Sequence, residues 1–277
     1  MGISRCVTIA GSDSGGGAGI QADLKAFAAA GCHGMSVVVA LTAQNTVGVT
    51  AVEEAATGFV EAQLEAVFSD IGVDAAKTGM LFSVPIVETV ADFLAEHPVP
   101  LVVDPVMVAE SGAQLLDPSA RATLVELLLP RATVATPNLP EARSLVDSTA
   151  QLDTADLARA LHALGPRAVV VTGGHREEAT DVFFDGERLV ELPGERHPDG
   201  ATHGSGCTHS SVLAARLAHG DDPLEAARAA RQLASEAVAH GLREIGAGAG
   251  PVDILGIASK ADETARARAA GAVEVAR

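Results

Sequence analysis

Short apolar runs alternate with longer helix-forming segments along the chain, and this alternation restricts the fold more than any other sequence feature. The apolar runs, typical of buried strands, are residues 7–10, 37–41, 101–103, 133–135 and 168–171. The segments with helical spacing are residues 17–30, 58–70, 84–96, 118–129, 154–164, 208–218 and 223–240. Capping residues, Ser83 and Asp153, precede two of them. The pattern predicts an α/β fold in three layers (α/β/α), with a mostly parallel central sheet between helices.

One segment departs from this alternation. In residues 182–192, Asp185 and Gly186 stand between two apolar runs, which indicates a small β-hairpin. No internal repeat or low-complexity linker interrupts the chain, so we expect a single domain over residues 1–255. Residues 256–277 are polar and rich in alanine, and we expect a peripheral helix or a frayed tail there.

Composition excludes several classes of protein. A formal net charge of −17 argues against binding of nucleic acid, which calls for a basic surface. The sequence contains neither an apolar run long enough for a membrane helix nor a signal-like start, so we expect a cytoplasmic protein without a membrane partner. The three cysteines lack the spacing of a disulfide framework or a zinc site. Arginine far outnumbers lysine, which fits either a salt-adapted host or a GC-rich genome.

A glycine-containing stretch, His203-Gly204-Ser205-Gly206-Cys207-Thr208, stands before the helical segment that Gly220 closes. The free amides and the positive dipole end of a helix start bind anions, and glycines let the backbone approach a phosphate closely. The stretch therefore indicates a site for phosphoryl transfer. From these residues alone, a glycine loop followed by a buried cysteine is an equal alternative.

The loop after the first predicted strand, residues 11–23, holds five glycines and runs into a helix. It is not a Walker A loop, because no Gly-Lys-Ser/Thr follows. Residues 17–22 match the loose dinucleotide pattern, but the acidic residue expected at the end of the second strand is absent. A dinucleotide site is therefore disfavoured.

Oxygen-bearing side chains follow two later strands. Asp104 comes after one of them, and Asn138 and Glu141 come after the next. Carboxylates of this kind, with phosphate oxygens, bind Mg²⁺. Taken singly, Asp104 could cap a turn, and Asn138 and Glu141 could begin a helix. Ligands bind beyond the carboxyl ends of the strands in open α/β sheets, so we expect the three to converge on one edge.

Long motifs in a fixed order carry a resemblance to a known family. They are residues 10–25, 40–46, 77–81, 103–107, 136–142, 173–175, 204–208 and 246–252. Together they resemble the hydroxymethylpyrimidine and phosphomethylpyrimidine kinases of thiamine biosynthesis, within the ribokinase-like superfamily. The resemblance spans about residues 5–255.

The resemblance implies a ribokinase-like enzyme that uses MgATP twice. It phosphorylates 4-amino-5-hydroxymethyl-2-methylpyrimidine and then phosphorylates that monophosphate to the diphosphate. It also implies a homodimer. The residues implied to hold the pyrimidine are Gly11, Asp23, Gln44, Met80 and Val106.

The family also implies the reacting and nucleotide-binding groups. Cys207 takes the place of the aspartate base of related sugar kinases and either accepts the proton or positions the hydroxyl, and a helix start favours its thiolate. The amides of Gly204, Ser205 and Gly206 would form the anion hole with it. The residues implied for ATP are Asn138, Thr172, Gly174 and Thr208, and those for Mg²⁺ are Asp104 and Glu141.

One position departs from the family. Thr172 stands where a lysine often precedes Gly-Gly-His, so a cation near the nucleotide phosphates is missing. Two other functions remain open at this point. One is a pyridoxal kinase of the same superfamily, against which Gln44 and Met80 speak. The other is a catalytically weakened protein that senses the pyrimidine.

Overall fold

The computed structural model describes residues 2–147, 152–174 and 179–264, and in this part of the chain the strands form one nine-stranded sheet of order β3-β2-β1-β4-β5-β6-β7-β8-β9. The strands are β1 (Arg5–Asp13), β2 (His33–Gln44), β3 (Val49–Glu54), β4 (Ala75–Thr78), β5 (Leu101–Val103), β6 (Val134–Ala135), β7 (Val169–Val171), β8 (Asp181–Phe184) and β9 (Leu189–Leu192). Strands β2, β1, β4, β5, β6 and β7 run parallel, whereas β3, β8 and β9 pair antiparallel at the two edges.

The helices connect these strands. They are α1 (Gly19–Ala29), α2 (Thr57–Ala66), α3 (Val84–Glu96), α4 (Ala120–Thr123), α5 (Leu139–Val146), α6 (Thr154–His162), α7 (Ser205–Ala218) and α8 (Pro223–Ala239). Helix α2 continues as the π-helical turn η1 (Val67–Ile71), and α4 continues as η2 (Leu124–Leu128) and the 3-10 turn η3 (Leu129–Arg131).

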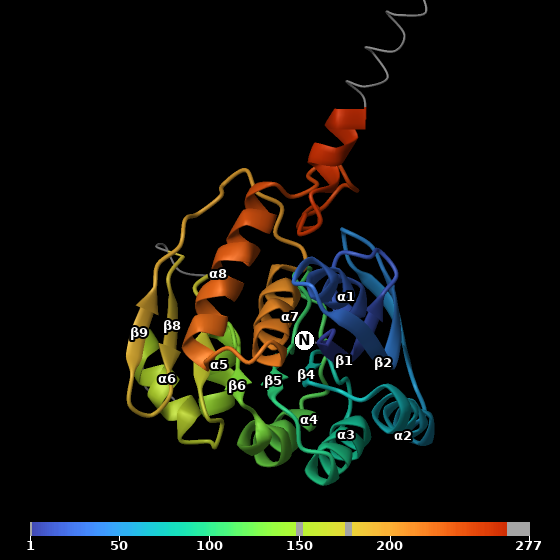
Figure 1. The fold of residues 1–277 in the computed structure, drawn as a ribbon, viewed down its shortest axis with the longest axis vertical. Coiled ribbons are helices and arrows are strands. Elements are labelled where there is room, and N and C mark those ends of the chain that lie inside the picture. The colour runs from blue at the N-terminus through green and yellow to red at the C-terminus, as the bar shows by residue number, and fades with distance from the viewer. Residues whose placement is uncertain (1, 148–151, 175–178, 265–277) are drawn as a thin grey trace, which may run out of the picture.

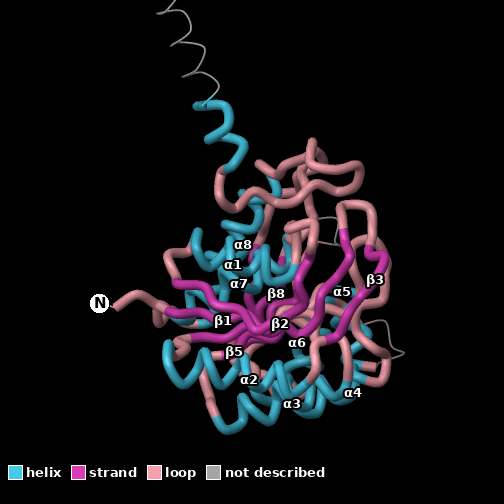
Figure 2. Tube along the Cα trace, turned by 90° about the vertical axis from the view of Figure 1, so that its right-hand side faces the viewer, coloured by secondary structure: helices cyan, strands magenta, loops and turns pink. Residues whose placement is uncertain are grey.

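The helices cover both faces of the sheet (Figures 1 and 2). Helices α1, α7 and α8 pack on one face, where Phe27 and Val212 are fully buried. Helices α2, α3, α5 and α6 pack on the other, around residues such as Leu64 and Val90. Burial on both faces explains why the central strands are continuous apolar runs. The predicted three-layer α/β/α fold is confirmed.

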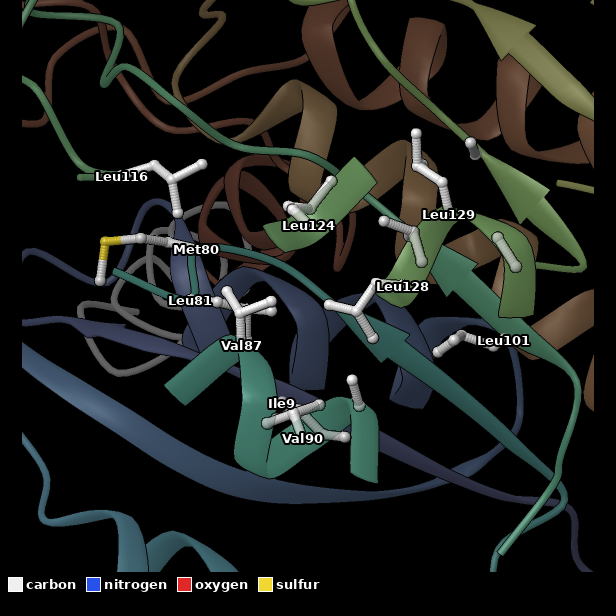
Figure 3. Packing of buried hydrophobic residues seen from close by; sticks show 14 of the residues in the cluster. Ile9, Met80, Leu81, Val87, Val90, Leu101, Leu116, Leu124, Leu128 and Leu129 are labelled. Carbon is white, nitrogen blue, oxygen red and sulfur yellow. The ribbon is translucent and has the colours of Figure 1, made fainter. Parts of the chain in front are cut away.

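The larger of the two apolar clusters packs the sheet against α3 and the segment after α4 (Figure 3). Ile9 of β1 and Leu101 of β5 meet Val90 of α3 and Leu128 of η2, and each of these side chains is at most 2% exposed. On the opposite face, α8 contributes mostly alanines to the core, and α7 contributes Ala214 and Ala215 beside larger apolar side chains. The small alanine side chains let the two helices approach closely, which sets the start of α7 firmly against the sheet.

Several local predictions can be compared with the structure. The hairpin is confirmed as β8 and β9, with Gly186 at φ 94° in its turn. Asp153 caps α6 by accepting the Asp156 amide, but Ser83 makes no such cap, because its hydroxyl donates to Glu54 instead. Strand β3 was not predicted. Its residues are half-buried or exposed at the sheet edge, so it lacks the apolar run of a central strand.

The described part of the tail is helical. Residues 257–264 form a short exposed helix, and Asp253 accepts the amides of Ile257 and Ala258 at its start. The boundary of the domain at residue 255 stays a prediction. Within the described ranges, no helix is both long and apolar enough to cross a bilayer.

Candidate active site

A cavity of about 880 Å³ opens at the carboxyl ends of the parallel strands. The loops after β1 and β5 line it, together with the first turns of α5 and α7. This is the edge at which open α/β sheets bind ligands. The volume lies in the upper part of the range for small-molecule sites.

Most of the predicted site residues line this cavity. They are Gly11, Gln44, Met80, Asp104, Val106, Glu141, Thr172, Gly174, Gly204, Ser205, Gly206 and Cys207. Three predicted residues, Asp23, Asn138 and Thr208, do not line it. His175, which belongs to one of the family motifs, lies outside the described residues.

The anion-binding stretch forms the first turn of α7. The helix begins at Ser205, three residues earlier than predicted, and Gly204 precedes it at φ 83°. A Cβ at Gly204 would lie 1.8 Å from the Gly17 carbonyl oxygen, so only glycine fits between the two loops. The Gly206 and Cys207 amides lie in this first turn, where helical amides lack intrahelical partners. The turn can therefore bind a phosphate.

The residues predicted for the pyrimidine line the same cavity. Met80 is 7% exposed, and its terminal methyl would lie 2.2 Å from a Cβ at Gly11, so glycine at position 11 gives the methionine its place. The Gln44 side chain is held by the Thr42 hydroxyl at 3.1 Å. A flat apolar surface beside a fixed amide suits an aromatic ring that bears hydrogen-bonding nitrogens.

The structure corrects the prediction that Asp23 contacts the pyrimidine. Asp23 is fully buried under the cavity floor, and both of its carboxylate oxygens lie 3.0 Å from the Lys77 ammonium nitrogen. Thr8 and Ser211 also donate their hydroxyls to it, at 2.6 and 2.8 Å. Asp23 faces the sheet because it lies on the inner side of α1, so its carboxylate serves Lys77 and not a ligand.

Lys77 is the cation beneath the reaction site. Its side chain is fully buried, lines the cavity, and lies 3.7 Å from Asp104. Burial acts to lower its pKa, but the Asp23, Cys207 and Asp104 groups outweigh burial and raise it. Lys77 is therefore charged at neutral pH.

Cys207 lies half-buried at the cavity wall. Burial raises the pKa of its thiol to about 12, against the lowering effects of Lys77 and the Gly19 amide. The expectation that the helix start would favour a thiolate is wrong for this conformation, because burial and the carboxylates of Asp23 and Asp104 outweigh the positive groups. The neutral thiol can still orient a hydroxyl group.

Asp104 and Glu141 supply two carboxylates to the same cavity. Asp104 accepts the Ser210 hydroxyl at 2.8 Å, and burial raises its pKa. Burial and the neighbouring Asp104 charge raise the pKa of Glu141 to about 8. In both cases burial is the main cause, because it disfavours the charged form of a carboxyl group. The pair fits Mg²⁺, which usually takes one or two carboxylates and fills its other positions with water and phosphate oxygens.

Asn138 has a structural role in the described geometry. It accepts the Glu141 amide while Glu141 accepts the Asn138 amide, both at 2.9 Å, which is a reciprocal cap of α5. The reading of these residues as a helix start is therefore correct for Asn138, and Glu141 both caps the helix and faces the cavity. No group of three or more His, Cys, Asp and Glu side chains gathers as a metal site in the described ranges.

A third wall of the cavity lies around Thr172 and Gly174 and carries a poorly bonded charged cluster. His209 lies 3.5 Å from Asp181, and Arg231 lies 3.8 Å from the same carboxylate oxygen. Both His209 ring nitrogens, Asp181 Oδ2 and Arg231 Nε are buried without a hydrogen-bond partner. Burial lowers the pKa of His209, so its ring is neutral. Thr208 is fully buried beside this cluster in sequence, and its hydroxyl also lacks a partner.

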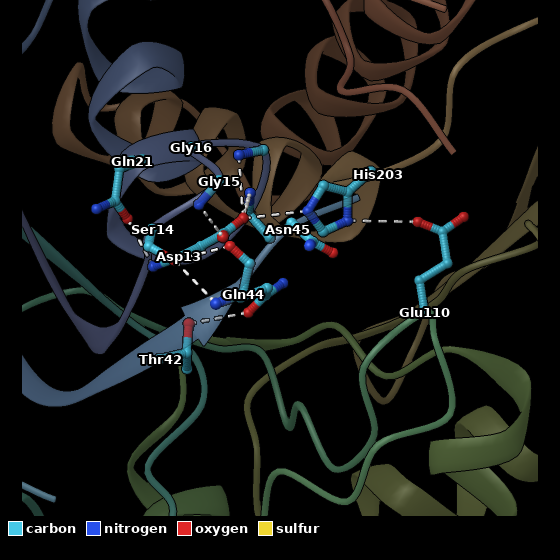
Figure 4. A network of polar contacts seen from close by, with 12 residues as sticks. Asp13, Ser14, Gly15, Gly16, Gln21, Thr42, Gln44, Asn45, Glu110 and His203 are labelled. Atoms are coloured by element: carbon cyan, nitrogen blue, oxygen red, sulfur yellow. Dashed lines mark hydrogen bonds and ion pairs between the residues drawn. The ribbon is translucent and has the colours of Figure 1, made fainter. Parts of the chain in front are cut away.

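A polar network joins the glycine loop to the start of α7 (Figure 4). Asp13 accepts the amides of Gly15, Gly17 and Ala18 at 2.7 to 3.0 Å. Its Oδ2 also lies 3.1 Å from His203 Nε2. Burial acts to raise the pKa of Asp13, but these bonds outweigh it and lower the pKa. The glycine loop is thus held in a turn around the ionised Asp13 carboxylate.

The family model described as phosphomethylpyrimidine kinase matches residues 13–253. The chain belongs to this family. The hydroxymethylpyrimidine/phosphomethylpyrimidine kinase of Rhizobium meliloti is 51% identical over 252 residues, which cover 89% of this chain and 95% of the relative. The kinase of the same name from Streptomyces coelicolor is 48% identical and covers 89% of this chain and 93% of its own.

Solved structures agree with this assignment of the kinase. A phosphomethylpyrimidine kinase from Clostridium difficile is 40% identical, with a TM-score of 0.76, over 85% of this chain and 99% of its own. An ADP complex of Bacillus subtilis pyridoxal kinase is 38% identical, with a TM-score of 0.84, over 91% of this chain and 97% of its own. The expected ribokinase-like kinase fold is therefore confirmed, and the relatives favour the kinase over a catalytically weakened sensor of the pyrimidine.

Sequence reasoning missed several cavity residues of the kinase. Lys77 could have been found from the sequence, because a lysine inside a buried strand needs an acidic partner and so indicates a buried ion pair. The sequence gives a weaker indication for His203, which stands directly before the anion-binding turn. The segment 195–198 and Arg231 also line the cavity, but they lie in a coil and on a helix without any motif. Only the folded chain brings them to the site.

Proposed function

We propose that this kinase transfers the γ-phosphoryl group of ATP to the hydroxymethyl oxygen of 4-amino-5-hydroxymethyl-2-methylpyrimidine. In a second transfer, a phosphate oxygen of the resulting monophosphate attacks ATP, and the products are the diphosphate and ADP. The observation that supports the proposal best is the arrangement of one cavity, in which Gln44 and Met80 lie at one end and the first turn of α7 lines the wall. That turn can hold the transferred group in both steps.

We assign the ring to the end with Gln44, Met80, Gly11 and Val106. The methionine covers an aromatic face, while the amide offers a donor and an acceptor to the ring nitrogens and the amino group. Thr42 fixes the amide before the substrate arrives. A ring held in this way presents its hydroxymethyl group in a defined direction, which is the main requirement of phosphoryl transfer.

We assign the nucleotide to the wall with Thr172, Gly174, Asp181 and Arg231. Asp104 and Glu141 would hold the Mg²⁺ that neutralises phosphate charge. Lys77 places a buried positive charge next to Asp104, which acts against the effect of burial on the pKa of that carboxylate and supports the anion hole. Arg231 takes over part of the role of the cation that Thr172 does not provide.

We assign to Cys207 the positioning of the substrate hydroxyl. Its thiol is neutral, so it does not remove the proton before the transfer. A loose transition state develops little charge on the attacking oxygen, so a strong base is not needed early in the reaction. The monophosphate presents an oxygen that is already ionised, and the second transfer therefore depends less on this residue.

The test of the proposal is ADP release with MgATP and, in parallel, hydroxymethylpyrimidine, its monophosphate and pyridoxal. We expect turnover of both pyrimidines and little turnover of pyridoxal. Pyridoxal is the necessary comparison, because pyridoxal kinases of Bacillus subtilis and Staphylococcus aureus share this fold. Turnover of pyridoxal alone would show that pyridoxal, and not the pyrimidine, is the substrate. Unchanged turnover after chelation of Mg²⁺ would show that the reaction does not need the metal.

We further propose that the kinase is a cytoplasmic homodimer. The family resemblance supports the dimer, and the exposed apolar side chains of Leu41 in β2 and Val47 in the turn between β2 and β3 are compatible with a protein contact. Light scattering coupled to size-exclusion chromatography tests the dimer, and a monomer at micromolar concentration would contradict it.

A further inference from the structure

His203 joins two acidic residues that come from different parts of the chain. Its Nε2 lies 3.1 Å from Asp13 in the glycine loop, and its Nδ1 lies 3.5 Å from Glu110 in the loop after β5. Figure 4 shows the ring between the two carboxylates. The His203 side chain is only 11% exposed, whereas that of Glu110 is 43% exposed. One acid is thus fixed in the protein, and the other reaches in from the surface.

The His203 backbone is fixed as well. Its amide donates to the Gly250 carbonyl, and its carbonyl accepts the Val252 amide, both at 3.1 Å. A Cβ at Gly17 would lie 2.1 Å from the imidazole ring, so the glycine loop packs directly against it. Residues 204–207, which form the anion-binding turn, follow immediately. A shift of His203 would therefore move this turn.

The loop that carries Glu110 covers the cavity. We call residues 105–117 the flap. Within it the Leu115 amide donates to the Met107 carbonyl and the Ala109 amide donates to the Ala113 carbonyl, so it folds back on itself. Val106, Ala109 and Leu115 of the flap line the cavity. Glu110 also accepts the Thr202 hydroxyl, which gives the flap a second contact beside His203.

We propose that His203 is a positioning residue of the kinase, which ties the flap through Glu110 to the anion-binding turn and so holds the flap over the bound pyrimidine. The inference rests on the proposed function. It assigns to Glu110 and His203 a role that neither motif spacing nor direct contact with the reacting atoms would indicate. When the tie is broken, the ring loses its cover on the side of Val106, and binding of the pyrimidine weakens.

The charge on the imidazole supports this role. The hydrogen bonds with Asp13 and Glu110 raise the pKa of His203 to about 9, against the lowering effect of burial. The ionised groups that face the ring are Asp13 from the glycine loop and Glu110 from the flap. At neutral pH the ring is cationic and attracts both. Above about pH 9 it becomes neutral, and the tie to the flap weakens.

The experiment compares the wild type with Glu110→Gln and His203→Gln in steady-state kinetics from pH 6.5 to 10. Glu65→Gln is the matched control, since Glu65 is an exposed acid on α2 outside the cavity. At pH 7.5 we expect Glu110→Gln to raise the KM for hydroxymethylpyrimidine about fivefold, as the loss of a partly exposed ion pair predicts. We expect the KM for ATP and kcat to change less.

The pH profile separates this role from a purely structural one. We expect kcat/KM of the wild type to fall above about pH 9, the fall to move to lower pH in Glu110→Gln, and the fall to be lost in His203→Gln. Identical profiles in all variants, or a KM of Glu110→Gln equal to that of Glu65→Gln, would overturn the inference. A wild type without any turnover would contradict the proposed function instead. Hydrogen exchange of the flap amides tests the inference without turnover. If Glu110 holds the flap against His203, the flap amides should exchange faster in Glu110→Gln than in the wild type.

Discussion

The floor of the cavity and the wall that we assign to the nucleotide, called the nucleotide wall below, both bury charged side chains, but the contacts of these side chains differ. On the floor, Lys77 and Asp23 are fully buried, both Asp23 oxygens lie 3.0 Å from the Lys77 ammonium nitrogen, and two hydroxyls also donate to Asp23. On the nucleotide wall, His209 and Arg231 lie 3.5 and 3.8 Å from Asp181 and leave polar atoms without a partner. The first arrangement is complete without a ligand, and the second is not.

This difference indicates when each region becomes ordered for catalysis. A buried polar group without a hydrogen bond costs free energy, and a ligand that supplies the bond recovers it. The floor is therefore preorganised, whereas we expect the nucleotide wall to gain its missing partners only when a nucleotide binds. We infer that the reaction centre of the kinase is rigid before ligands bind, and that the nucleotide supplies the missing hydrogen bonds of the other wall.

The strongest test of the comparison removes the floor cation. Lys77→Met should lower the free energy of unfolding by about 3–5 kcal/mol, because it leaves Asp23 charged and unpaired in the core. Urea denaturation measures this loss. Lys25→Met is the matched control, since Lys25 is partly exposed and bonds a single carbonyl oxygen, that of Gly16. Equal losses in the two variants would contradict the contrast, and adding Asp23→Asn to Lys77→Met should recover part of the loss.

A second test addresses the group that stands above the floor. Cys207→Ala should slow the first phosphoryl transfer about a hundredfold, because the hydroxyl loses its positioning partner. The second transfer should slow less, since its nucleophile is an ionised phosphate. Single-turnover kinetics with each pyrimidine measures both steps. Cys32→Ala, at a cysteine that does not line the cavity, serves as control, and equal losses in the two steps would speak against the assignment.

A third test uses pH to weaken a complete network. The folded pKa of His203 is raised to about 9, mainly by the bond with Asp13, whereas an unfolded histidine titrates near 6.5. Its contribution to stability is therefore full below pH 6.5 and is lost as pH rises through about 9. We expect the wild type to lose about 1–3 kcal/mol over this window relative to His203→Gln. Parallel stability curves for the two proteins would refute this.

The smallest effect should come from the incomplete wall. His209→Leu should change the free energy of unfolding by less than about 1 kcal/mol, because neither ring nitrogen makes a hydrogen bond in the free protein. The KM for ATP should rise, since the nucleotide loses a partner on that wall. Thermal denaturation with and without ADP measures both effects. A loss as large as that of Lys77→Met would show that the wall is already complete.

The order of elements and the edge that carries the site could be predicted from the sequence. Helix α3 has the predicted bounds, Val84–Glu96, because its apolar positions repeat with a clear helical period. Strand β3 escaped prediction, since an exposed edge strand has no apolar run. The start of α7 was placed three residues late, because Gly204 and Gly206 look like loop residues until the contact with Gly17 explains the first of them.

The sequence by itself determined the fold class, the family and the loops that face the ligand, because these depend on local periodicity and on motifs of adjacent residues. The tertiary structure decided which charges meet. Asp13 and His203 are 190 residues apart in sequence, and Lys77 and Asp23 are 54 apart. Such pairs form only when the strand order places their segments side by side, and burial then fixes both their partners and their pKa values. For that reason Asp23 could be recognised as part of a motif, but its carboxylate could be assigned to Lys77 only in the folded chain.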